Sequence, residues 1–345
     1  MPKDIVLVTG GSGFIAGHVI LQLLEKNYLV RTTIRSLARQ GEVAQVLKAA
    51  GAKNLQNLEF VAADLMEDAG WSKAVTDARY VIHVASPVSP GHVKNEDEVI
   101  RPAREGTMRV LEAARDANVK RVVLTSAFHA VSWGHPHSDH VFTEADWTVL
   151  DGRGVDAYGK SKTIAERSAW DFMVNEGAGT ELTTILPVAV MGPVMGKAIS
   201  GSNHAIERLL SGAMPAMPDI YIPIVDVRDV AAAHIAAMTT PEAAGERFLI
   251  SNGPALSMAD IAAILKRDLG DGAKRVPTRV LPNFVLRLVA LFNPEARAIV
   301  PDLGYAKKTS NEKARRILGW TPRAPEEAIA SAGRSMLDRH LIEQP

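Results

Sequence analysis

Short apolar runs alternate with longer amphipathic segments through the first half of this chain, and that alternation constrains its fold more than any other feature. The runs are rich in Val, Ile and Leu and cover 5–9, 28–34, 58–62, 80–84, 121–126 and 182–186. The segments between them repeat their apolar residues with helical spacing, at 17–26, 41–50, 96–117 and 156–175. Strands that alternate with helices form parallel sheets whose crossover helices cover both faces. The sequence therefore predicts an α/β fold with a doubly wound parallel sheet.

The alternation weakens near residue 190, where Pro and Met become frequent and the helices stop alternating regularly with strands. This change predicts two domains. We expect a Rossmann-type nucleotide-binding domain over 1–190, to which part of 222–250 returns. We expect a smaller, mostly helical substrate-binding lobe over 191–345.

The composition excludes several classes of protein. The 345 residues include 39 Lys and Arg, 39 Asp and Glu, and no Cys. A net charge of zero disfavours nucleic-acid binding, and the lack of Cys excludes thiolate metal sites and a thiol nucleophile. No run approaches the roughly 18 apolar residues of a membrane span, and the N-terminus lacks a signal-peptide pattern. We expect a cytoplasmic protein, monomer or homodimer, that acts on a small molecule and binds neither nucleic acid nor membrane.

A glycine-rich turn, Thr-Gly-Gly-Ser-Gly-Phe-Ile-Ala-Gly at 9–17, follows the first apolar run and opens a helix. One glycine permits the tight turn, another lets the backbone approach a pyrophosphate, and the small residue at 16 lets helix and strand pack closely. A purely structural turn is the alternative. The context favours dinucleotide binding, with contacts from Gly10, Gly13, Phe14 and Ile15.

The residues after the second run predict which dinucleotide binds. NAD enzymes usually carry an acidic residue there, and NADP enzymes carry a basic one. This chain has Arg35, with Arg39 four residues on, and no acid before Glu42. A guanidinium can bind a phosphate through two hydrogen bonds, so we predict that Arg35 and Arg39 hold the 2′-phosphate of NADP, the alternative being solvated surface arginines. Asp64, just past the third run, is placed to accept from the adenine amino group or to cap a helix.

Tyr158 and Lys162 form a Tyr-x-x-x-Lys pair near the start of the helix expected at 156–175. The spacing puts both side chains on one helical face. A phenol has a reference pKa near 10, and a neighbouring ammonium and a cationic nicotinamide favour the phenolate. Tyr158 is predicted to give a proton to a carbonyl oxygen while hydride arrives from NADPH, and Lys162 to hold the nicotinamide ribose. The alternative is an exposed tyrosine beside a surface lysine.

Several motifs occur together in the order typical of one family. They are Thr9-Gly10-x-x-Gly13-Phe14-Ile15, Asp64-Leu65, His83-Val84-Ala85-Ser86-Pro87, Ala157-Tyr158-x-x-Ser161-Lys162-Thr163-Ile164-Ala165-Glu166, Leu186-Pro187-Val188-Ala189-Val190-Met191-Gly192-Pro193, Val225-Asp226-Val227-Arg228-Asp229-Val230-Ala231 and Leu318-Gly319-Trp320-Thr321-Pro322. Over nearly its whole length the chain resembles the extended short-chain dehydrogenase/reductase (NAD-dependent epimerase/dehydratase) family, and within it the dihydroflavonol 4-reductase and cinnamoyl-CoA reductase group. The resemblance implies an NADP cofactor with further contacts from Leu65, Ala85, Pro187 and Val190.

One departure from the family concerns the catalytic hydroxyl. The family usually has Thr-Ser-Ser after the fifth strand, whereas this chain has Thr125-Ser126-Ala127, so the expected serine falls on Ala127. Because side chains alternate along a strand, Thr125 shares the direction of Ala127, unless the backbone turns and swings Ser126 inward. We predict Ser126 as the donor to the substrate, with Thr125 second. If neither reaches it, the loss of one such donor typically costs on the order of a hundredfold in rate.

The segment 128–147 contains His129 and the cluster His135, His137 and His140. A metal site is one interpretation of the cluster, but the segment is loop-like and borders the expected substrate pocket, so we expect a pocket-lining histidine and no metal. His83, within a buried run, is expected to be a hydrogen-bonded core residue.

These observations predict an NADPH-dependent reductase that converts an apolar, aromatic or bulky aldehyde or ketone into the alcohol, reversibly. The substrate is expected over the nicotinamide, in contact with 86–93, 128–133 and 191–221. One alternative is a sugar-nucleotide epimerase or dehydratase that retains NAD, which Arg35 disfavours. Another is a non-catalytic NADP sensor, which the missing serine keeps open.

Overall fold

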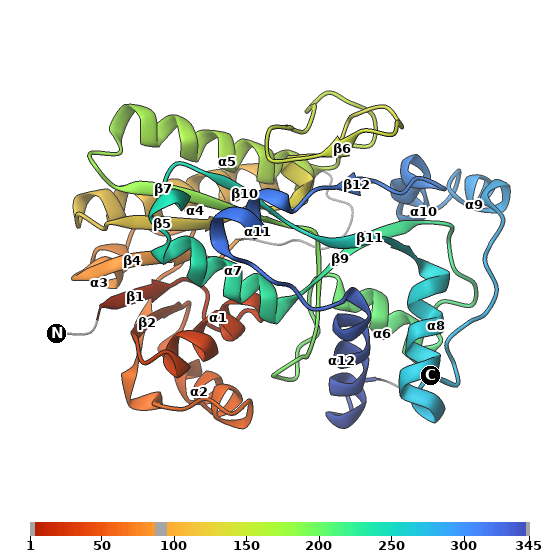
Figure 1. Cartoon of the computed structure of the whole chain (residues 1–345), viewed down its shortest axis with the longest axis horizontal. Coiled ribbons are helices and arrows are strands. Elements are labelled where there is room, and N and C mark those ends of the chain that lie inside the picture. Colours follow the sequence, from red (N-terminus) through yellow and green to blue (C-terminus); the bar gives the residue numbers. More distant parts are fainter. Residues whose placement is uncertain (1–3, 87–94, 343–345) are drawn as a thin grey trace.

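The structure, a computed structural model, describes residues 4–86 and 95–342 and confirms the doubly wound sheet (Figure 1). Seven parallel strands lie in the order β10-β7-β5-β4-β1-β2-β3. Their bounds are β1 (Ile5–Val8), β2 (Leu29–Ile34), β3 (Leu58–Ala62), β4 (Ala78–His83), β5 (Arg121–Thr125), β7 (Glu181–Pro187) and β10 (Arg247–Ile250). The six apolar runs supply the first six of these strands. The seventh, β10, lies at the edge next to β7.

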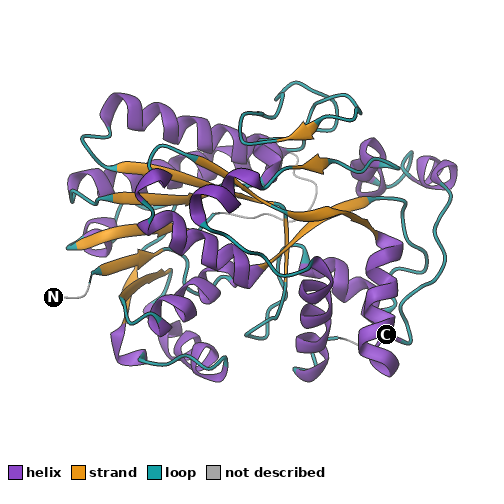
Figure 2. Cartoon of the chain, in the orientation of Figure 1, coloured by secondary structure: helices purple, strands orange, loops and turns teal. Residues whose placement is uncertain are grey.

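Helices cover both faces of the sheet (Figure 2). One face carries α1 (Phe14–Glu25), α2 (Gln40–Ala49), α7 (Val227–Thr239) and α11 (Glu312–Leu318), and the other carries α3 (Trp71–Val75), α4 (Asp97–Asp116) and α5 (Ala157–Glu176). Successive residues of β1 point to opposite faces of the sheet. Val6 and Val8 pack in the core on the α1 side, and Leu7 packs in the core on the α4 side. Strands buried on both faces in this way are apolar nearly throughout, which explains the runs in the sequence.

A second core lies beyond the carboxyl edge of the large sheet. It contains a three-stranded sheet in the order β11-β9-β8, which the sequence did not predict, together with helices. The elements are β8 (Ala189–Met191), β9 (Tyr221–Asp226), β11 (Asn252–Ser257), α6 (Asn203–Ser211), α8 (Met258–Leu269) and α12 (Pro325–Asp338). In Figure 1 they occupy the right-hand part of the molecule, where α9 (Asn283–Val289) and α10 (Pro294–Ile299) form a small separate cluster.

The histidine-containing loop is joined to a C-terminal segment. The two-stranded pairing of β6 (Val141–Phe142) with β12 (Lys308–Thr309) connects them, and His137 stacks on Tyr305 with ring centroids 3.9 Å apart. The remaining short helices are 310 turns, η1 (Leu37–Arg39), η2 (Leu55–Asn57), η3 (Phe128–Ala130), η4 (Pro241–Ala243), η5 (Gly270–Ala273) and η6 (Val300–Asp302). The loop is therefore held in place by residues more than 160 positions away in the chain.

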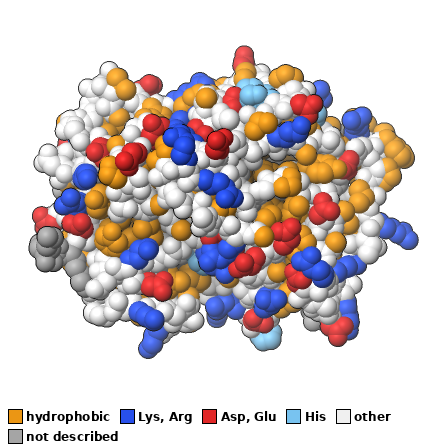
Figure 3. Space-filling model, in the orientation of Figure 1, with side chains coloured by type: hydrophobic (Ala, Val, Ile, Leu, Met, Phe, Trp, Pro, Cys, Tyr) orange, Lys and Arg blue, Asp and Glu red, His pale blue; other side chains and the backbone are white. Residues whose placement is uncertain are grey.

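On the face seen in Figure 3, charges of both signs are interspersed rather than separated, in agreement with the zero net charge. Within the described parts of the chain, none of the helices combines the length and the apolar character that crossing a bilayer requires.

A buried ion pair between Glu166 and Arg247 connects α5 to the far edge of the sheet. The Glu166 side chain is 0% exposed, and its Oε1 accepts from Arg247 Nε at 2.8 Å and from Thr184 Oγ1 at 2.9 Å. Its Oε2 accepts from Ser126 Oγ at 2.6 Å. The Arg247 guanidinium lies 3.6 Å from the ring centre of Trp147. A buried carboxylate is tolerated only when its oxygens are bonded in this way.

We expect the substitution Glu166→Ala to lower the free energy of unfolding by about 3–5 kcal/mol, because it leaves the Arg247 guanidinium buried without a counter-charge. Glu176, near the end of the same helix, pairs with Arg115 but its side chain is 62% exposed. The matched control Glu176→Ala should therefore cost under about 1 kcal/mol. Urea unfolding of both variants tests this, and equal losses would contradict the role assigned to Glu166.

Candidate active site

The structure brings most of the predicted site residues to one edge of the large sheet. Parallel strands end at the same edge, and ligands of such sheets bind there. The residues at or just past the carboxyl ends of successive strands are Gly10 to Ile15 after β1, Arg35 after β2, Asp64 and Leu65 after β3, Ala85 after β4, Ser126 after β5 and Pro187 at the end of β7. Tyr158 and Lys162 lie near the start of α5, and Val190 lies in β8.

The glycine turn packs so closely against β2 that Gly11 has no room for a side chain. Gly10 has a φ of +73°, and a Cβ on Gly11 would lie 2.2 Å from Thr32 Oγ1. The Gly10 amide donates to Thr33 Oγ1 at 3.0 Å, and the Gly11 amide donates to the Thr33 carbonyl at 2.9 Å. The glycines are therefore required by left-handed backbone at one position and by close approach at the next.

Thr9 ties the ends of β1 and β4 together beneath this turn. Its hydroxyl accepts from the amides of Val84 and Ala85 at 3.0 and 2.9 Å, and it lies 2.8 Å from His83 Nδ1. Burial, followed by the charge of Lys162, lowers the pKa of His83 to about 3, so the ring is neutral and Nδ1 accepts the Thr9 proton. The expectation that His83 is a hydrogen-bonded core residue is confirmed.

The turn and its surroundings fit an anionic phosphate. Helix α1 starts after Gly13 with no side-chain cap and no acidic residue in its first turn, so its first amides lack intrahelical acceptors. Such amides and the helix dipole favour negative charge. Arg35 is exposed and has no charged or hydrogen-bonding partner in the described ranges. Arg39 instead pairs with Glu42 at 3.1 Å, and Asp64 Oδ1 accepts from the Met66 amide at 3.0 Å.

The helix that carries the Tyr-x-x-x-Lys pair is capped by Asp156, whose Oδ1 accepts from the Gly159 amide at 2.7 Å. The Lys162 ammonium is buried and donates to the Thr125 carbonyl at 3.4 Å. Burial lowers the pKa of Lys162 to about 8, against the opposing charge of Glu166. The Tyr158 hydroxyl has no hydrogen-bond partner among the residues described.

The pKa of Tyr158 differs from the sequence expectation. Burial, followed by the charge of Asp156, raises the pKa of Tyr158 to about 12, whereas the neighbouring lysine was expected to lower it. Burial removes the phenolate from water, and this favours the neutral phenol. In the protein alone, Tyr158 is therefore protonated at neutral pH.

Both hydroxyls considered as substitutes for the missing serine are already engaged. Thr125 Oγ1 lies 2.7 Å from His234 Nε2, and His234 Nδ1 donates to the Val230 carbonyl, so Nε2 accepts the Thr125 proton. Ser126 donates to Glu166, facing a cavity of about 10 Å³, which has room for about one water molecule and not for a substrate. The geometry thus gives no support to Ser126 or Thr125 as the donor to the substrate.

Beside Tyr158 lies an imidazole to which the sequence assigned no chemical role. The ring of His129 stacks on Trp133 with centroids 3.7 Å apart, and it meets the Tyr158 ring edge to face with centroids 4.9 Å apart. The Lys307 ammonium lies 4.1 Å from the centre of the Trp133 ring. The sequence placed 128–133 near the substrate, and the position of His129 two residues after Ala127 was the signal that could have singled it out.

The other three histidines of the loop have separate partners. His135 contacts the Trp147 carbonyl, His137 contacts the Pro301 carbonyl, and His140 contacts Asp146, at 3.0, 2.8 and 3.0 Å respectively. Of the predicted substrate contacts, 87–93 lies outside the described residues. Within 191–221, Met195 Cε lies 2.5 Å from where a Cβ on Gly17 would be, so this segment covers the first turns of α1.

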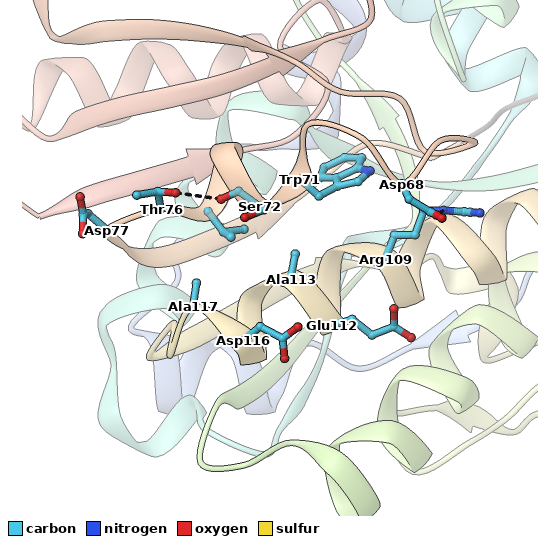
Figure 4. A pocket seen from close by; sticks show the side chains of 11 residues that line it. Asp68, Trp71, Ser72, Thr76, Asp77, Arg109, Glu112, Ala113, Asp116 and Ala117 are labelled. Atoms are coloured by element: carbon cyan, nitrogen blue, oxygen red, sulfur yellow. Dashed lines mark hydrogen bonds and ion pairs between the residues drawn. The ribbon is translucent and has the colours of Figure 1, made fainter.

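A separate groove of about 510 Å³ runs between α3 and α4 (Figure 4). Its charged lining is one arginine, Arg109, against the carboxylates of Asp68, Asp77, Glu112 and Asp116. Arg109 points toward Asp68 and pairs with it at 2.6 Å, which leaves the rest of the lining acidic. An excess of carboxylates disfavours an anionic dinucleotide, and this supports the glycine turn as the cofactor site.

Comparisons with known proteins agree with this geometry. Residues 6–251, more than half of the chain, match the sequence model described as the NAD dependent epimerase/dehydratase family. A ketoreductase of Aspergillus niger is 31% identical, with 97% of this chain and 98% of that one covered. Cinnamoyl-CoA reductase CAD2 of Medicago truncatula is 34% identical, with 72% of this chain and 76% of that one covered.

Solved structures of NADPH-bound reductases have a similar fold. The yeast methylglyoxal/isovaleraldehyde reductase Gre2, complexed with NADPH, superimposes with a TM-score of 0.80 at 27% identity, covering 97% of this chain and 99% of that one. Gre2 of Candida albicans in complex with NADPH has a TM-score of 0.81 at 27% identity, covering 98% of this chain and 100% of that one.

The buried histidines predict loss of stability in acid. His83 and His234 stay neutral in the folded state because burial lowers their pKa values to about 3 and about 4, whereas unfolded histidine titrates near 6.5. Between these values the unfolded chain binds more protons than the folded one. The free energy of unfolding should therefore decrease as the pH is lowered, by on the order of 1 kcal/mol per pH unit for each histidine. Urea unfolding at about pH 7 and about pH 5 measures this slope.

The variant His234→Gln removes one titrating group, so its unfolding free energy should depend less steeply on pH than that of the wild type. The exposed His340 provides the control His340→Gln, which should follow the wild type. An unchanged slope in His234→Gln would contradict the neutral state assigned to His234.

Proposed function

The chain belongs to the NAD-dependent epimerase/dehydratase family, and on that premise we propose that it is an NADPH-dependent reductase that converts an apolar, aromatic or bulky aldehyde or ketone into the alcohol. The observation that carries the proposal is the protonated, unpartnered phenol of Tyr158 one helical turn from the buried Lys162. A group in that state can donate a proton to a carbonyl oxygen. The reductases among the relatives and the NADPH-bound neighbours support it.

NADPH would be held by the glycine turn and by Arg35. The uncapped amides at the start of α1 would take the pyrophosphate, and the free guanidinium of Arg35 would take the 2′-phosphate. Arg39, paired with Glu42, could assist only by leaving that partner. When bound, NADPH supplies the hydride that the carbonyl carbon receives.

The protein's own residues would supply and stabilise the proton. Tyr158 would donate its proton to the carbonyl oxygen and become a phenolate. The Lys162 ammonium, anchored by the Thr125 carbonyl, would stabilise that negative charge. With a pKa of about 8, Lys162 is mostly protonated at neutral pH, and it loses this charge in more alkaline solution.

An apolar or aromatic substrate is supported by the rings that surround Tyr158. His129 and Trp133 present stacked rings beside the phenol, and Phe128 packs against Trp133 with centroids 5.6 Å apart. An epimerase that retains NAD is the weaker alternative, because the exposed, unpartnered Arg35 would have no phosphate to bind there.

We expect Tyr158→Phe to abolish NADPH oxidation with every carbonyl substrate while leaving the NADPH dissociation constant within about threefold of the wild type, since only the proton donor is lost. Tyr28→Phe, just before β2 and remote from α5, is the matched control and should keep full activity. Absorbance of NADPH measures turnover and NADPH fluorescence measures binding. Substantial activity in Tyr158→Phe would refute the mechanism.

We expect Arg35→Ala to raise the KM for NADPH by roughly 10- to 100-fold, the value of a lost charge-assisted interaction, with little change in kcat or in the KM for NADH. Arg101→Ala, which removes an arginine 72% exposed on α4, is the control and should change neither constant. Steady-state kinetics with both cofactors measures the difference. Equal effects on NADPH and NADH would show that Arg35 does not contact the 2′-phosphate.

A further inference from the structure

We propose that the imidazole of His129 donates a hydrogen bond to the substrate's carbonyl oxygen and so replaces the hydroxyl that is missing at Ala127. This inference rests on the proposed carbonyl reduction and adds a second catalytic donor to Tyr158. Two donors that converge on one oxygen stabilise the negative charge that develops there as hydride is added to the carbon.

The local backbone brings His129 to the site. Ala127 is extended, with φ −158° and ψ 158°, and the 310 turn η3 (Phe128–Ala130) follows it directly. The chain therefore turns just after the sheet edge, and the first large polar side chain past Ala127 is that of His129. The backbone carbonyl of His129 accepts from the Thr148 hydroxyl at 2.7 Å, which fixes the turn against the loop.

Aromatic contacts hold the ring in one orientation. It stacks on Trp133 with an interplanar angle of 15°, and it meets Tyr158 edge to face at 76°. The Lys307 ammonium, paired with Asp302 at 2.5 Å, lies over the Trp133 ring at 4.1 Å. Since His129 and Lys307 both lie close to the centre of that ring, they occupy its two faces. A donor held in this way needs little reorganisation to meet a substrate.

The ring nitrogens of His129 are available for a ligand. In the described part of the chain no group is hydrogen-bonded to either of them, whereas the buried His18, His83 and His234 each have a partner. Burial, followed by the charges of Lys307 and Lys162, lowers the pKa of His129 to about 3, so the ring is neutral and carries one N–H donor. An unbonded imidazole beside the unbonded Tyr158 hydroxyl therefore marks where a carbonyl oxygen would accept from both.

Rescue by a restored serine tests this proposal. The substitution His129→Phe keeps a flat ring to stack on Trp133 but removes the N–H. We expect it to lower kcat on the order of a hundredfold with the NADPH dissociation constant unchanged. Adding Ala127→Ser to that variant should recover at least about tenfold, because the hydroxyl returns to its usual place. Ala127→Ser alone should change kcat little, because the donor is already present.

The outcomes separate this proposal from the proposed function. A wild type that reduces carbonyls, together with a His129→Phe variant of similar kcat, would refute the role of His129 alone, as would failure of Ala127→Ser to raise the activity of His129→Phe. A wild type that reduces no carbonyl would refute both. If His129→Phe does not fold by thermal unfolding, His129→Gln and His129→Leu replace it. The glutamine, which keeps an N–H, should retain far more activity than the leucine, and equal activities would refute the proposal.

Discussion

The buried ion pair of Glu166 and Arg247 is the interaction on which the arrangement of the site depends. Glu166 lies one helical turn after Lys162 and two turns after Tyr158 on α5, so its bonds set the position of both. Those bonds reach Ser126 after β5, Thr184 in β7 and Arg247 in β10. One carboxylate thus joins the helix that carries Tyr158 and Lys162 to β7, β10 and the end of β5, and it engages the Ser126 hydroxyl.

Burial, more than pairing of charges, determines the ionisation states in this site. It raises the pKa of Tyr158 and lowers that of Lys162, and it keeps His83 and His129 neutral. Desolvation always favours the uncharged form, so the phenol keeps its proton and the imidazole carries a single N–H. Among these four groups, only Lys162, with a pKa of about 8, is mostly charged at neutral pH.

The proposed substrate side of the site is assembled from parts of the chain that are distant in sequence. The loop after β5 brings His129 and Trp133, and the segment before β12 brings Lys307. The pairing of β6 with β12 and the stacking of His137 on Tyr305 hold these parts together. Most of the predicted cofactor contacts, by contrast, lie in the turns after the first four strands, and Lys162, Pro187 and Val190 add the rest from α5, β7 and β8. This division explains why family resemblance identifies the cofactor class readily and the substrate only coarsely.

The sequence by itself determined the six apolar strands, the glycine turn and the one-turn spacing of Tyr158 and Lys162, because each is a local pattern whose period or turn chemistry is fixed by neighbouring residues. It could not show that Ser126 bonds to Glu166, since the two are 40 positions apart, nor that His129 reaches Tyr158. It also missed the three-stranded sheet of β8, β9 and β11, whose pairing is long-range. Only the tertiary structure decided which polar groups are bonded and which remain free. Direction, burial and hydrogen-bond partners depend on contacts between distant segments, and at this site they leave the His129 ring nitrogens unbonded while Ser126 and Thr125 are engaged.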